Sequence, residues 1–336
     1  MFDIITVGSA TKDIFLTGKA FKAINLDKKI SFIGQAQCFP LGGKIEIDGI
    51  CAKTGGGATN AAFTFKRQGL KTATLVKTGK DEAGEHILQE LKKEKISILA
   101  LKDNKKETSQ SVILSSSLGE RTILTYRGAS EDFNVTEIPF NKLNSQWAFI
   151  SSGHISPAVL AKIFSYFSKN KTLIALNLSQ YYIEMGVKKL EPFLKQSKVV
   201  ILNCEEAAVF TGISYEKEKE IFAKFDKLID GIAIMTKGNK GISMSDGKNI
   251  YKAGIFQGKI VDRTGAGDAF GSGFISGLIQ KNNLKSEVIK YAIRLGMANA
   301  TSVVGKIGAK TGVLTKKEFI NNKRWQKLSI QVQNVK

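Results

Sequence analysis

The 336-residue sequence is poor in the residues on which several common kinds of site depend. It contains three cysteines, which are scattered along the chain and lack CxxC spacing. An odd number of isolated cysteines is typical of reduced thiols and excludes a cysteine zinc site. His86 and His154 are the only histidines, so a histidine-based metal site or a Ser-His-Asp triad has almost nothing to be built from.

Long apolar runs are also absent. No stretch reaches the roughly 18 apolar residues of a membrane-spanning helix, and the chain opens directly on a strand pattern at Asp3 rather than on a secretory signal. The sequence therefore predicts a cytoplasmic protein that has no membrane partner. With 43% hydrophobic and 24% charged residues, the chain is long enough to bury a large core.

Acidic residues are outnumbered by basic ones, and the formal net charge is +20. Such an excess raises the question of nucleic-acid binding. The excess is mainly lysine mixed with glutamate, as in residues 90–95, and no basic stripe interleaved with aromatic residues is visible. The pattern favours a basic solvated surface over a nucleic-acid-binding role, and its positive field would attract anionic nucleotides.

Short apolar runs alternate with helix-length amphipathic segments along most of the chain. The predicted strands cover residues 3–7, 73–76, 147–150, 173–176, 199–202 and 232–235. The predicted helices cover residues 58–68, 83–93, 157–168, 205–210, 217–228, 266–279 and 287–304. This rhythm, with strands that are apolar throughout, predicts a doubly wound α/β fold in which helices flank a mostly parallel sheet.

Two stretches, 14–52 and 105–128, break this alternation. They carry strand-like runs at residues 30–33, 45–47, 111–114 and 122–126. We expect them to form one small β-sheet lid over the site. The main α/β domain, which would bind nucleotide and substrate, then comprises residues 1–13, 53–104 and 129–336. A lid strand also offers an edge for pairing with a second subunit, so a homodimer through the lid is an expectation that an exposed edge alone does not establish. The tail after Phe319 is predicted to be a surface element.

The segment DRTGAGDAF, residues 262–270, leads from a short apolar strand into a glycine-laden helix. Gly265, Ala266 and Gly267 allow backbone N–H groups to converge at a helix start, where the helix dipole favours a phosphate. Asp268 stands in the same first turn, where an acid either serves chemistry or merely caps the helix. Several glycines in this helix cost roughly 1 kcal/mol each relative to alanine, which favours the functional interpretation.

A second glycine-rich segment, GGGATNAA, also leads into a predicted helix. Its glycines permit close backbone approach to a ligand, and Asn60 offers donors and acceptors suited to vicinal hydroxyls; a flexible turn with an N-cap is the alternative. Farther along, Asn203 and Glu206 form an NxxE at a strand-to-helix junction, where both can hold a hydrated Mg²⁺ through water. A glutamate near a helix start is also commonplace without a metal.

No Walker A sequence and no GxGxxG after the first strand occurs, so a bound nucleotide needs another architecture. The DRTGAGDAF segment, preceded in order by GGGATNAA, NCEE and TKG, resembles the ribokinase-like (PfkB) family of sugar and nucleoside kinases. The resemblance extends from Gly8 to about Leu314. It implies a ribokinase-like fold with a small β lid, and an ATP-dependent, Mg²⁺-requiring kinase whose acceptor is an alcohol group.

The resemblance also implies roles for individual residues. Asp268 matches the catalytic base, and residues 265–267 match the anion hole. The residues that match the acceptor pocket are Asp13, Gly55, Gly56, Asn60 and Asn177. Those that match nucleotide-binding positions are Thr236, Lys237, Gly238, Asn299, Gly308 and Ala309. Those that match metal-associated positions are Asn203 and Glu206 for Mg²⁺, with Asp262 and Thr264 for a stimulatory monovalent cation such as K⁺ in some members.

The sequence leaves the role of Arg127 and the identity of the acceptor undecided. Arg127 returns from the lid toward the acceptor, either to read a phosphate or to meet a surface carboxylate. The leading hypothesis is phosphorylation of a primary hydroxyl of a small sugar, as in a ribokinase or fructokinase. The run at residues 177–179 also resembles nucleoside kinases, so an adenosine-type kinase is the alternative. A non-catalytic sugar- or nucleotide-binding protein is a third hypothesis.

Overall fold

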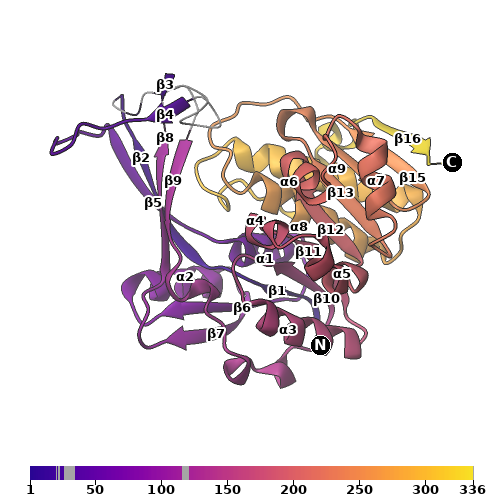
Figure 1. The fold of residues 1–336 in the computed structure, drawn as a ribbon, viewed down its shortest axis with the longest axis horizontal. Coiled ribbons are helices and arrows are strands. Elements are labelled where there is room, and N and C mark those ends of the chain that lie inside the picture. The colour runs from indigo at the N-terminus through magenta and orange to yellow at the C-terminus, as the bar shows by residue number, and fades with distance from the viewer. Residues whose placement is uncertain (20, 22, 26–34, 116–120, 336) are drawn as a thin grey trace.

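The computed structural model describes residues 1–19, 21, 23–25, 35–115 and 121–335, and within them the largest element is a ten-stranded sheet (Figure 1). Its strands lie in the order β16-β15-β14-β13-β12-β11-β10-β1-β6-β7. The parallel strands are β1 (Phe2–Val7), β6 (Thr72–Gly79), β7 (Ser97–Asp103), β10 (Ser145–Ser151), β11 (Leu173–Asn177), β12 (Val199–Asn203) and β13 (Ile232–Thr236). An antiparallel edge is formed by β14 (Ile242–Ser245), β15 (Asn249–Ala253) and β16 (Ile330–Asn334).

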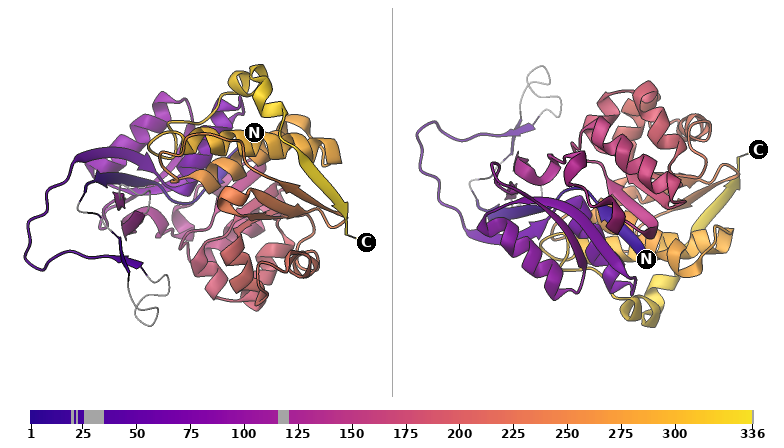
Figure 2. Two further views of the ribbon diagram at one scale, coloured as in Figure 1. Left: turned by 90° about the horizontal axis from the view of Figure 1, so that it is seen from above. Right: turned by 90° about the horizontal axis from the view of Figure 1, so that it is seen from below.

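Helices cover both faces of this sheet, because its strands are apolar on both sides (Figure 2). Successive residues of a strand point to opposite faces, so Ile4 of β1 enters one core and Ile5 the other. The helices of the first core are α1 (Gly57–Arg67), α8 (Ala266–Lys281), α9 (Ser286–Val304) and α10 (Lys316–Asn321). The helices of the second core are α3 (Pro157–Lys169), α4 (Gln180–Glu184), α5 (Val187–Lys195), α6 (Cys204–Thr211) and α7 (Glu218–Phe225). The doubly wound α/β fold predicted from the sequence is thereby confirmed.

The remaining helices are short or peripheral. α2 (Glu82–Lys93) packs its Ile87 and Leu91 into a smaller core with α1 and β6. The 3-10 helices are η1 (Gly128–Glu131), η2 (Val135–Glu137), η3 (Phe140–Lys142), η4 (Gly238–Lys240) and η5 (Lys323–Gln326). In the part of the chain that the structure describes, no helix is both long enough and apolar enough to cross a membrane.

A second, smaller sheet stands apart from the first, at the left of Figure 1. Its strands, in spatial order, are β5 (Gly49–Gly55), β2 (Thr11–Thr17), β8 (Ser109–Ser115) and β9 (Arg121–Tyr126). β2 pairs antiparallel with β5 and parallel with β8, so two segments far apart in the sequence share one sheet, as predicted. A separate pair is formed by β3 (Ala23–Asn25) and β4 (Gln35–Gln37). The domain limits and the closing motion of this sheet, called the lid sheet below, stay predictions.

One predicted lid strand is wrong, because residues 45–47 form no strand. β2 ends at Thr17, whose partner in the register is Gly49. Residues before Gly49 therefore have no strand of β2 opposite them, and apolar alternation without a hydrogen-bonding partner does not make a strand. The strand predicted at residues 30–33 lies outside the described residues.

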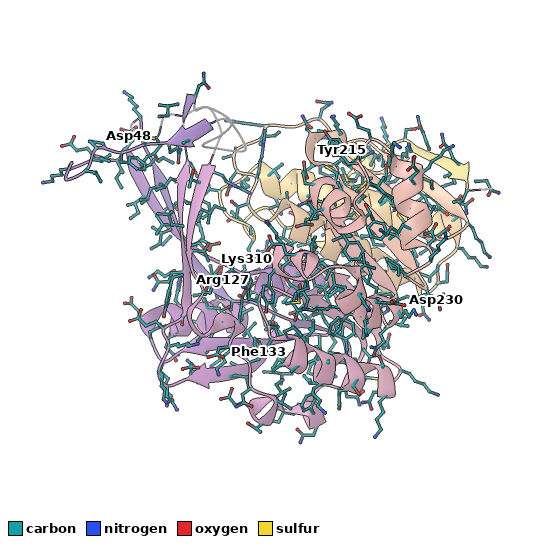
Figure 3. The ribbon with its side chains drawn as sticks, viewed as in Figure 1. Asp48, Arg127, Phe133, Tyr215, Asp230 and Lys310 are labelled. Atoms are coloured by element: carbon teal, nitrogen blue, oxygen red, sulfur yellow. The ribbon has the colours of Figure 1, made fainter. Side chains whose placement is uncertain are left out.

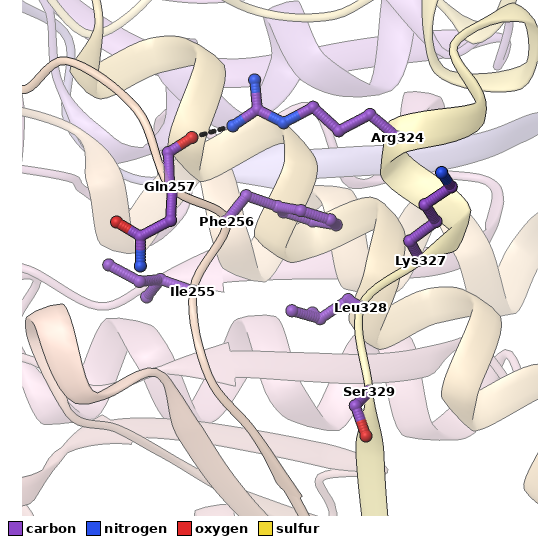
Figure 4. Close-up of a pocket in the computed structure, with 7 residues that line it drawn as sticks. All are labelled: Ile255, Phe256, Gln257, Arg324, Lys327, Leu328 and Ser329. Atoms are coloured by element: carbon purple, nitrogen blue, oxygen red, sulfur yellow. Dashed lines mark hydrogen bonds between the residues drawn. The ribbon is translucent and has the colours of Figure 1, made fainter.

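The tail after Phe319 is more than a surface element. Its strand β16 extends the large sheet, and Trp325 is buried with its ring centroid 4.9 Å from that of Phe256. Arg324 lies over the Trp325 ring and donates to the Gln257 carbonyl. A groove of about 580 Å³ runs between these two segments, and none of the predicted site residues lines it (Figure 4).

Candidate active site

Polar side chains end four neighbouring parallel strands. Ser151 ends β10, Asn177 ends β11, Asn203 ends β12 and Thr236 ends β13. The register places Ser151 beside Asn177, and Asn203 beside Thr236. Because ligands of open α/β sheets bind beyond the carboxyl ends of the strands, this edge of the sheet is where a site is expected.

The start of α8 presents unpaired backbone amides. Gly265, just before the helix, adopts a left-handed conformation with a φ of 75°. Among the described residues, the N–H groups of Gly265, Gly267 and Asp268 donate to no protein acceptor. Ala266 differs, because its N–H donates to the Arg263 carbonyl at 3.3 Å. Unpaired amides at a helix start, with the positive end of the helix dipole, can bind an anion.

The Asp268 carboxylate lies between α1 and the end of β11. Asn60 Nδ2 donates to Asp268 Oδ2 at 2.9 Å, and Asn177 Nδ2 lies 3.4 Å from Oδ1. A Cβ on Gly57 would lie 3.5 Å from Oδ1, so the glycine-rich loop passes directly by this carboxylate. Burial raises the pKa of Asp268, and the hydrogen bond from Asn60 partly offsets that rise. The carboxylate is thus oriented by two amides beside unpaired N–H groups, as a proton acceptor near an anion site requires.

Close packing explains the glycines that precede α1. A Cβ on Gly55 would lie 1.9 Å from Asp13 Oδ2. Gly56 has a φ of 97°, and its Cβ would lie 2.5 Å from the Ser9 carbonyl oxygen. The Gly57 N–H donates to Ser9 Oγ at 3.1 Å. The loop therefore lies directly against the strand that carries Asp13, with no room for a side chain at these positions.

Asp13 and Asn60 supply polar groups to this loop. Thr11 Oγ1 donates to the buried Asp13 carboxylate at 2.9 Å. Burial raises the pKa of Asp13, while the bond from Thr11 and the positive charge of Lys310 lower it. Asn60 Oδ1 is buried and has no hydrogen-bond partner within the described residues. A buried acceptor without a partner costs about 1–3 kcal/mol, and a ligand hydroxyl would satisfy it.

Asn203 and Glu206 form a capping box at the start of α6. The Asn203 N–H donates to Glu206 Oε2 at 2.8 Å, and the Glu206 N–H donates to Asn203 Oδ1 at 2.7 Å. Burial raises the pKa of Glu206. The NxxE pattern therefore has a structural use, and among the described residues it leaves Glu206 Oε1 without a hydrogen-bond donor.

Residues 236–238 follow β13. The Lys237 ammonium lies 3.2 Å from Glu218 Oε1 and 2.7 Å from Ser243 Oγ. Gly238 has a φ of 56° and begins η4. Because the protein's own groups hold the Lys237 ammonium, this strand end would contact a nucleotide mainly through Thr236 and the backbone.

Asn299 has a different position from the other residues predicted to contact nucleotide. It is fully buried in α9, where Nδ2 donates to Thr64 Oγ1 at 3.1 Å and to the Ala269 carbonyl at 2.9 Å. Asn299 Oδ1 accepts from the Leu314 N–H at 3.0 Å. The side chain ties α1, α8 and the loop after α9 together, and its polar atoms are used in doing so.

The sequence interpretation missed Arg121, at the start of lid strand β9. Its Nη1 donates to Thr264 Oγ1 at 2.8 Å and lies 3.4 Å from Asp262 Oδ1. Asp262 Oδ1 also accepts from the Thr264 N–H and hydroxyl, while Oδ2 accepts from the Gly308 N–H at 2.9 Å. Ala309, the next residue, packs where a Gly265 side chain would be, since a Cβ there would lie 2.3 Å from its Cβ. The only signal in the sequence was an arginine directly before the strand-like run at residues 122–126.

Arg127 meets a carboxylate in this structure. Its Nη1 lies 3.2 Å from Glu131 Oε2, and half of its side chain is exposed. Burial lowers the pKa of His154, and the Arg127 charge lowers it further. The Glu131 carboxylate lies against the residues that follow β10, since a Cβ on Gly153 would lie 2.5 Å from Glu131 Oε1. Figure 3 shows Arg127 between the lid sheet and the α/β body.

Comparison with known proteins supports one family. The sequence pattern of the pfkB family carbohydrate kinases matches residues 28–316. An ATP-dependent 6-phosphofructokinase of Thermoanaerobacterium thermosaccharolyticum is 26% identical over 277 residues, which covers 80% of this chain and 84% of the relative. A ribokinase of Giardia lamblia has a similar fold, with a TM-score of 0.77, 18% identity, and coverage of 95% of this chain and 97% of that one. A nucleoside kinase of Methanocaldococcus jannaschii gives a TM-score of 0.74 at 20% identity, with coverage of 97% and 98%. The chain belongs to the pfkB family of carbohydrate kinases, as the order of its motifs predicts.

Proposed function

We propose that this protein transfers the terminal phosphoryl group of ATP to a primary hydroxyl of a small sugar. The observation that supports this most is the convergence of the Asp268 carboxylate, the unpaired amides at the start of α8 and the α1 loop. Asp268 accepts the hydroxyl proton, and the amides of Gly265 and Gly267 stabilise charge on the phosphoryl group. A loose phosphoryl-transfer transition state needs alignment and charge stabilisation more than a strong base.

The acceptor would lie against the α1 loop. Asp13 and Asn60 Oδ1 accept hydrogen bonds from its hydroxyls, and the orphaned Asn60 oxygen is the group that most needs such a partner. Asn177 Nδ2, 3.4 Å from Asp268 Oδ1, keeps the base oriented. The Gly55 and Gly56 positions admit no side chain, so the acceptor contacts backbone there.

The residues fit a magnesium nucleotide. Mg²⁺ is commonly held by one or two carboxylates with waters and phosphates, and Glu206 Oε1 is available for such a water-mediated contact beside Asn203. Among the described residues, no cluster of three or more His, Cys, Asp or Glu suggests an all-protein metal cage. When bound, Mg²⁺ neutralises phosphate charge. Thr236, Gly238, Gly308 and Ala309 would line the nucleotide, with Asn299 supporting that region from the core.

Asp262 and Thr264 do not fit a monovalent cation in this arrangement. Both Asp262 oxygens accept hydrogen bonds from protein donors, and the Arg121 guanidinium already supplies a positive charge beside them. K⁺ would have to displace Arg121 to reach this pair. We therefore assign the positive charge at this position to the lid arginine, and activity should not depend on K⁺.

A nucleoside acceptor remains the second candidate, because the fold matches a nucleoside kinase with a TM-score of 0.74, close to the 0.74 and 0.77 found for two ribokinases. Arg127 bears on the choice. Its partner Glu131 has an exposed fraction of 11%, so an anionic acceptor would have to compete with that carboxylate for the guanidinium. This favours an uncharged sugar over a sugar phosphate.

A homodimer through the lid sheet is also proposed. β9 is an edge strand of that sheet, and Ile123, Leu124 and Tyr126 on it are exposed. Sedimentation of the purified protein would test this, since a monomer at micromolar concentration contradicts it. The cytoplasmic location expected from the sequence stays a prediction.

A coupled ATP-consumption assay over small sugars, their phosphates and ribonucleosides tests the proposed function. We expect turnover with at least one neutral sugar, with Mg²⁺ required and K⁺ without effect. Turnover only with a ribonucleoside would select the second candidate. A folded protein that binds ligand by calorimetry but phosphorylates no alcohol would support the non-catalytic hypothesis instead.

A further inference from the structure

The C-terminal tail contacts a loop of the α/β body through Arg324, a residue that the proposed chemistry does not use. Arg324 lies beyond residue 316, where the match to the family pattern ends. Its Nη2 donates to the Gln257 carbonyl (Figure 4). Its guanidinium lies 4.7 Å from the centroid of the Trp325 ring and 6.0 Å from that of the Phe256 ring. Both rings are buried and pack against each other, so they give the guanidinium a fixed surface on which to lie.

Gln257 lies in the loop that joins β15 to α8, and this loop has few hydrogen bonds. In the part of the chain that the structure describes, the main chain of residues 255–260 makes one hydrogen bond, the one from Arg324. Past this stretch, the N–H groups of Val261 and Asp262 donate to the Val304 carbonyl at 2.7 and 3.1 Å. The described hydrogen bonds therefore attach the middle of the loop to the rest of the protein through Arg324.

Both ends of this loop lie beside segments that we propose to line the nucleotide. At its start, a Cβ on Gly241, directly after η4, would lie 2.0 Å from the Ala253 carbonyl oxygen. At its end, Asp262 Oδ2 accepts from the Gly308 N–H at 2.9 Å. The unpaired N–H of Gly265 follows three residues later. The loop thus runs from the η4 side of the proposed nucleotide site to the Gly308 side and on to the anion site.

We infer that Arg324 is a positioning residue for the nucleotide, which acts by holding Gln257 and, through it, the loop between β15 and α8. The inference rests on the proposed function and adds a residue that lies outside the site itself. Without this bond, residues 255–260 would sample other conformations, and a nucleotide would have to order them at a cost in affinity. Asp268 and its bonds from Asn60 and Asn177 are not part of this loop, so the chemical step should change little.

The first test is the affinity for a non-hydrolysable ATP analogue with Mg²⁺, measured by calorimetry on wild type and Arg324→Met. Methionine supplies an apolar chain to cover Trp325 but cannot donate to the Gln257 carbonyl. The variant should bind about three- to tenfold more weakly, because hydrogen bonds from charged groups are among the stronger ones and exposure reduces their contribution. In steady-state kinetics the KM for ATP should rise, while kcat and the KM for the acceptor change little. Equal affinity in wild type and Arg324→Met would overturn the inference.

Three further variants separate this role from a loss of charge or of tail stability. Lys327→Met removes a positive charge from the same groove and should bind the analogue as wild type does. Arg294→Met removes a bond of the same kind, from Arg294 Nε to the Leu328 carbonyl at 3.2 Å, which holds the tail but not the loop. It should also keep its affinity. Arg324→Lys retains a donor and should recover part of the loss. Equal losses in Arg324→Met and both controls would overturn the inference.

Hydrogen exchange tests the loop itself, without nucleotide or acceptor. The Val261 and Asp262 amides should exchange faster in Arg324→Met than in wild type, because the loop before them opens more often, whereas the amides of β15 should keep their rates. Unchanged rates at both loop amides would contradict the inference. The two failures can be told apart: a wild type that binds no ATP analogue removes the proposed function, whereas binding that is equally tight in Arg324→Met removes only the role of Arg324.

Discussion

Two glycine-rich helix starts meet at the site, and their glycines are there for different reasons. Before α1, a Cβ on Gly55 or Gly56 would collide with Asp13 or with the Ser9 carbonyl. In α8, a Cβ on Gly267 would meet nothing within 4 Å. Packing within the protein therefore requires glycine at positions 55 and 56, whereas no protein atom fills the space beside Gly267.

This difference in packing distinguishes the loop before α1, which is filled by protein atoms, from the start of α8, which leaves room for a ligand. The α1 loop is packed tightly against Asp13 and the Ser9 carbonyl, while the α8 start keeps unpaired amides beside open space, as the proposed phosphoryl transfer needs. Asn60 joins the two through its bond to Asp268. Substitutions on the two sides should therefore fail in different ways.

Asp268→Asn should have the largest effect, because it removes the proton acceptor while keeping the shape of the side chain. We expect kcat to fall by about 10² to 10⁴, the usual range for a positioned acid or base, with ATP affinity and melting temperature little changed. Steady-state kinetics and nucleotide titration measure this. An unchanged kcat would remove Asp268 from its role.

Gly267→Ala tests whether the open space at the start of α8 holds a phosphoryl group. The new methyl meets no protein atom, so stability should change by less than about 1 kcal/mol. It would instead intrude on the phosphoryl group, and kcat should fall by about 10², as for loss of one oxyanion donor. Gly254→Ala, at a glycine that also faces open space but lies outside α8, is the control. Normal turnover in Gly267→Ala would mean that no phosphate lies there.

Gly55→Ala tests the close packing of the loop before α1 against Asp13. Its methyl would displace the Asp13 carboxylate, which a thermal melt should register as a loss of about 1–3 kcal/mol typical of overpacking. The KM for the acceptor should rise while the KM for ATP changes little. A stable variant with unchanged acceptor KM would show that Asp13 does not contact the acceptor.

The large sheet could be predicted from the sequence because its parallel strands are short and apolar throughout, as residues 199–202 illustrate. The lid was predicted less well. Pairing sets its limits, so residues 45–47 read as a strand although β2 ends before reaching them. Motif order predicts that Asp268 and Asn60 belong to one site, and the NxxE of Asn203 and Glu206 is a local pattern typical of a capping box. The contacts of Arg121 with Thr264 and Asp262 join segments that are far apart in the sequence, so no local pattern encodes them.

Arg121→Ala tests whether the contacts that the lid sheet makes with the residues before α8 contribute to turnover. The variant loses a hydrogen bond to Thr264 and a partly exposed contact with Asp262. We expect up to about a tenfold loss of kcat/KM for ATP, since charged hydrogen bonds contribute about 1.5–3 kcal/mol and exposure reduces this. Gain of K⁺ stimulation in this variant would support the assignment of positive charge to Arg121. A wild-type enzyme that already needs K⁺ would refute it.

Asn60→Ala should have the smallest effect on the chemical step. We expect that effect as a shift in the dependence of kcat on pH. The base must be ionised, so kcat is lost as pH falls through the pKa of Asp268, which burial raises above 3.8. The Asn60 hydrogen bond lowers that pKa, and its removal should move the acidic limb of kcat to higher pH. A limb that stays in place would indicate that the bond is absent during turnover.

A crystal structure with a non-hydrolysable ATP analogue and an accepted sugar tests the central claim most directly. The predicted result places the terminal phosphate within hydrogen-bonding distance of the Gly265 and Gly267 amides, with a sugar hydroxyl between that phosphate and the Asp268 carboxylate. A terminal phosphate bound elsewhere, or an acceptor hydroxyl out of reach of Asp268, would contradict it.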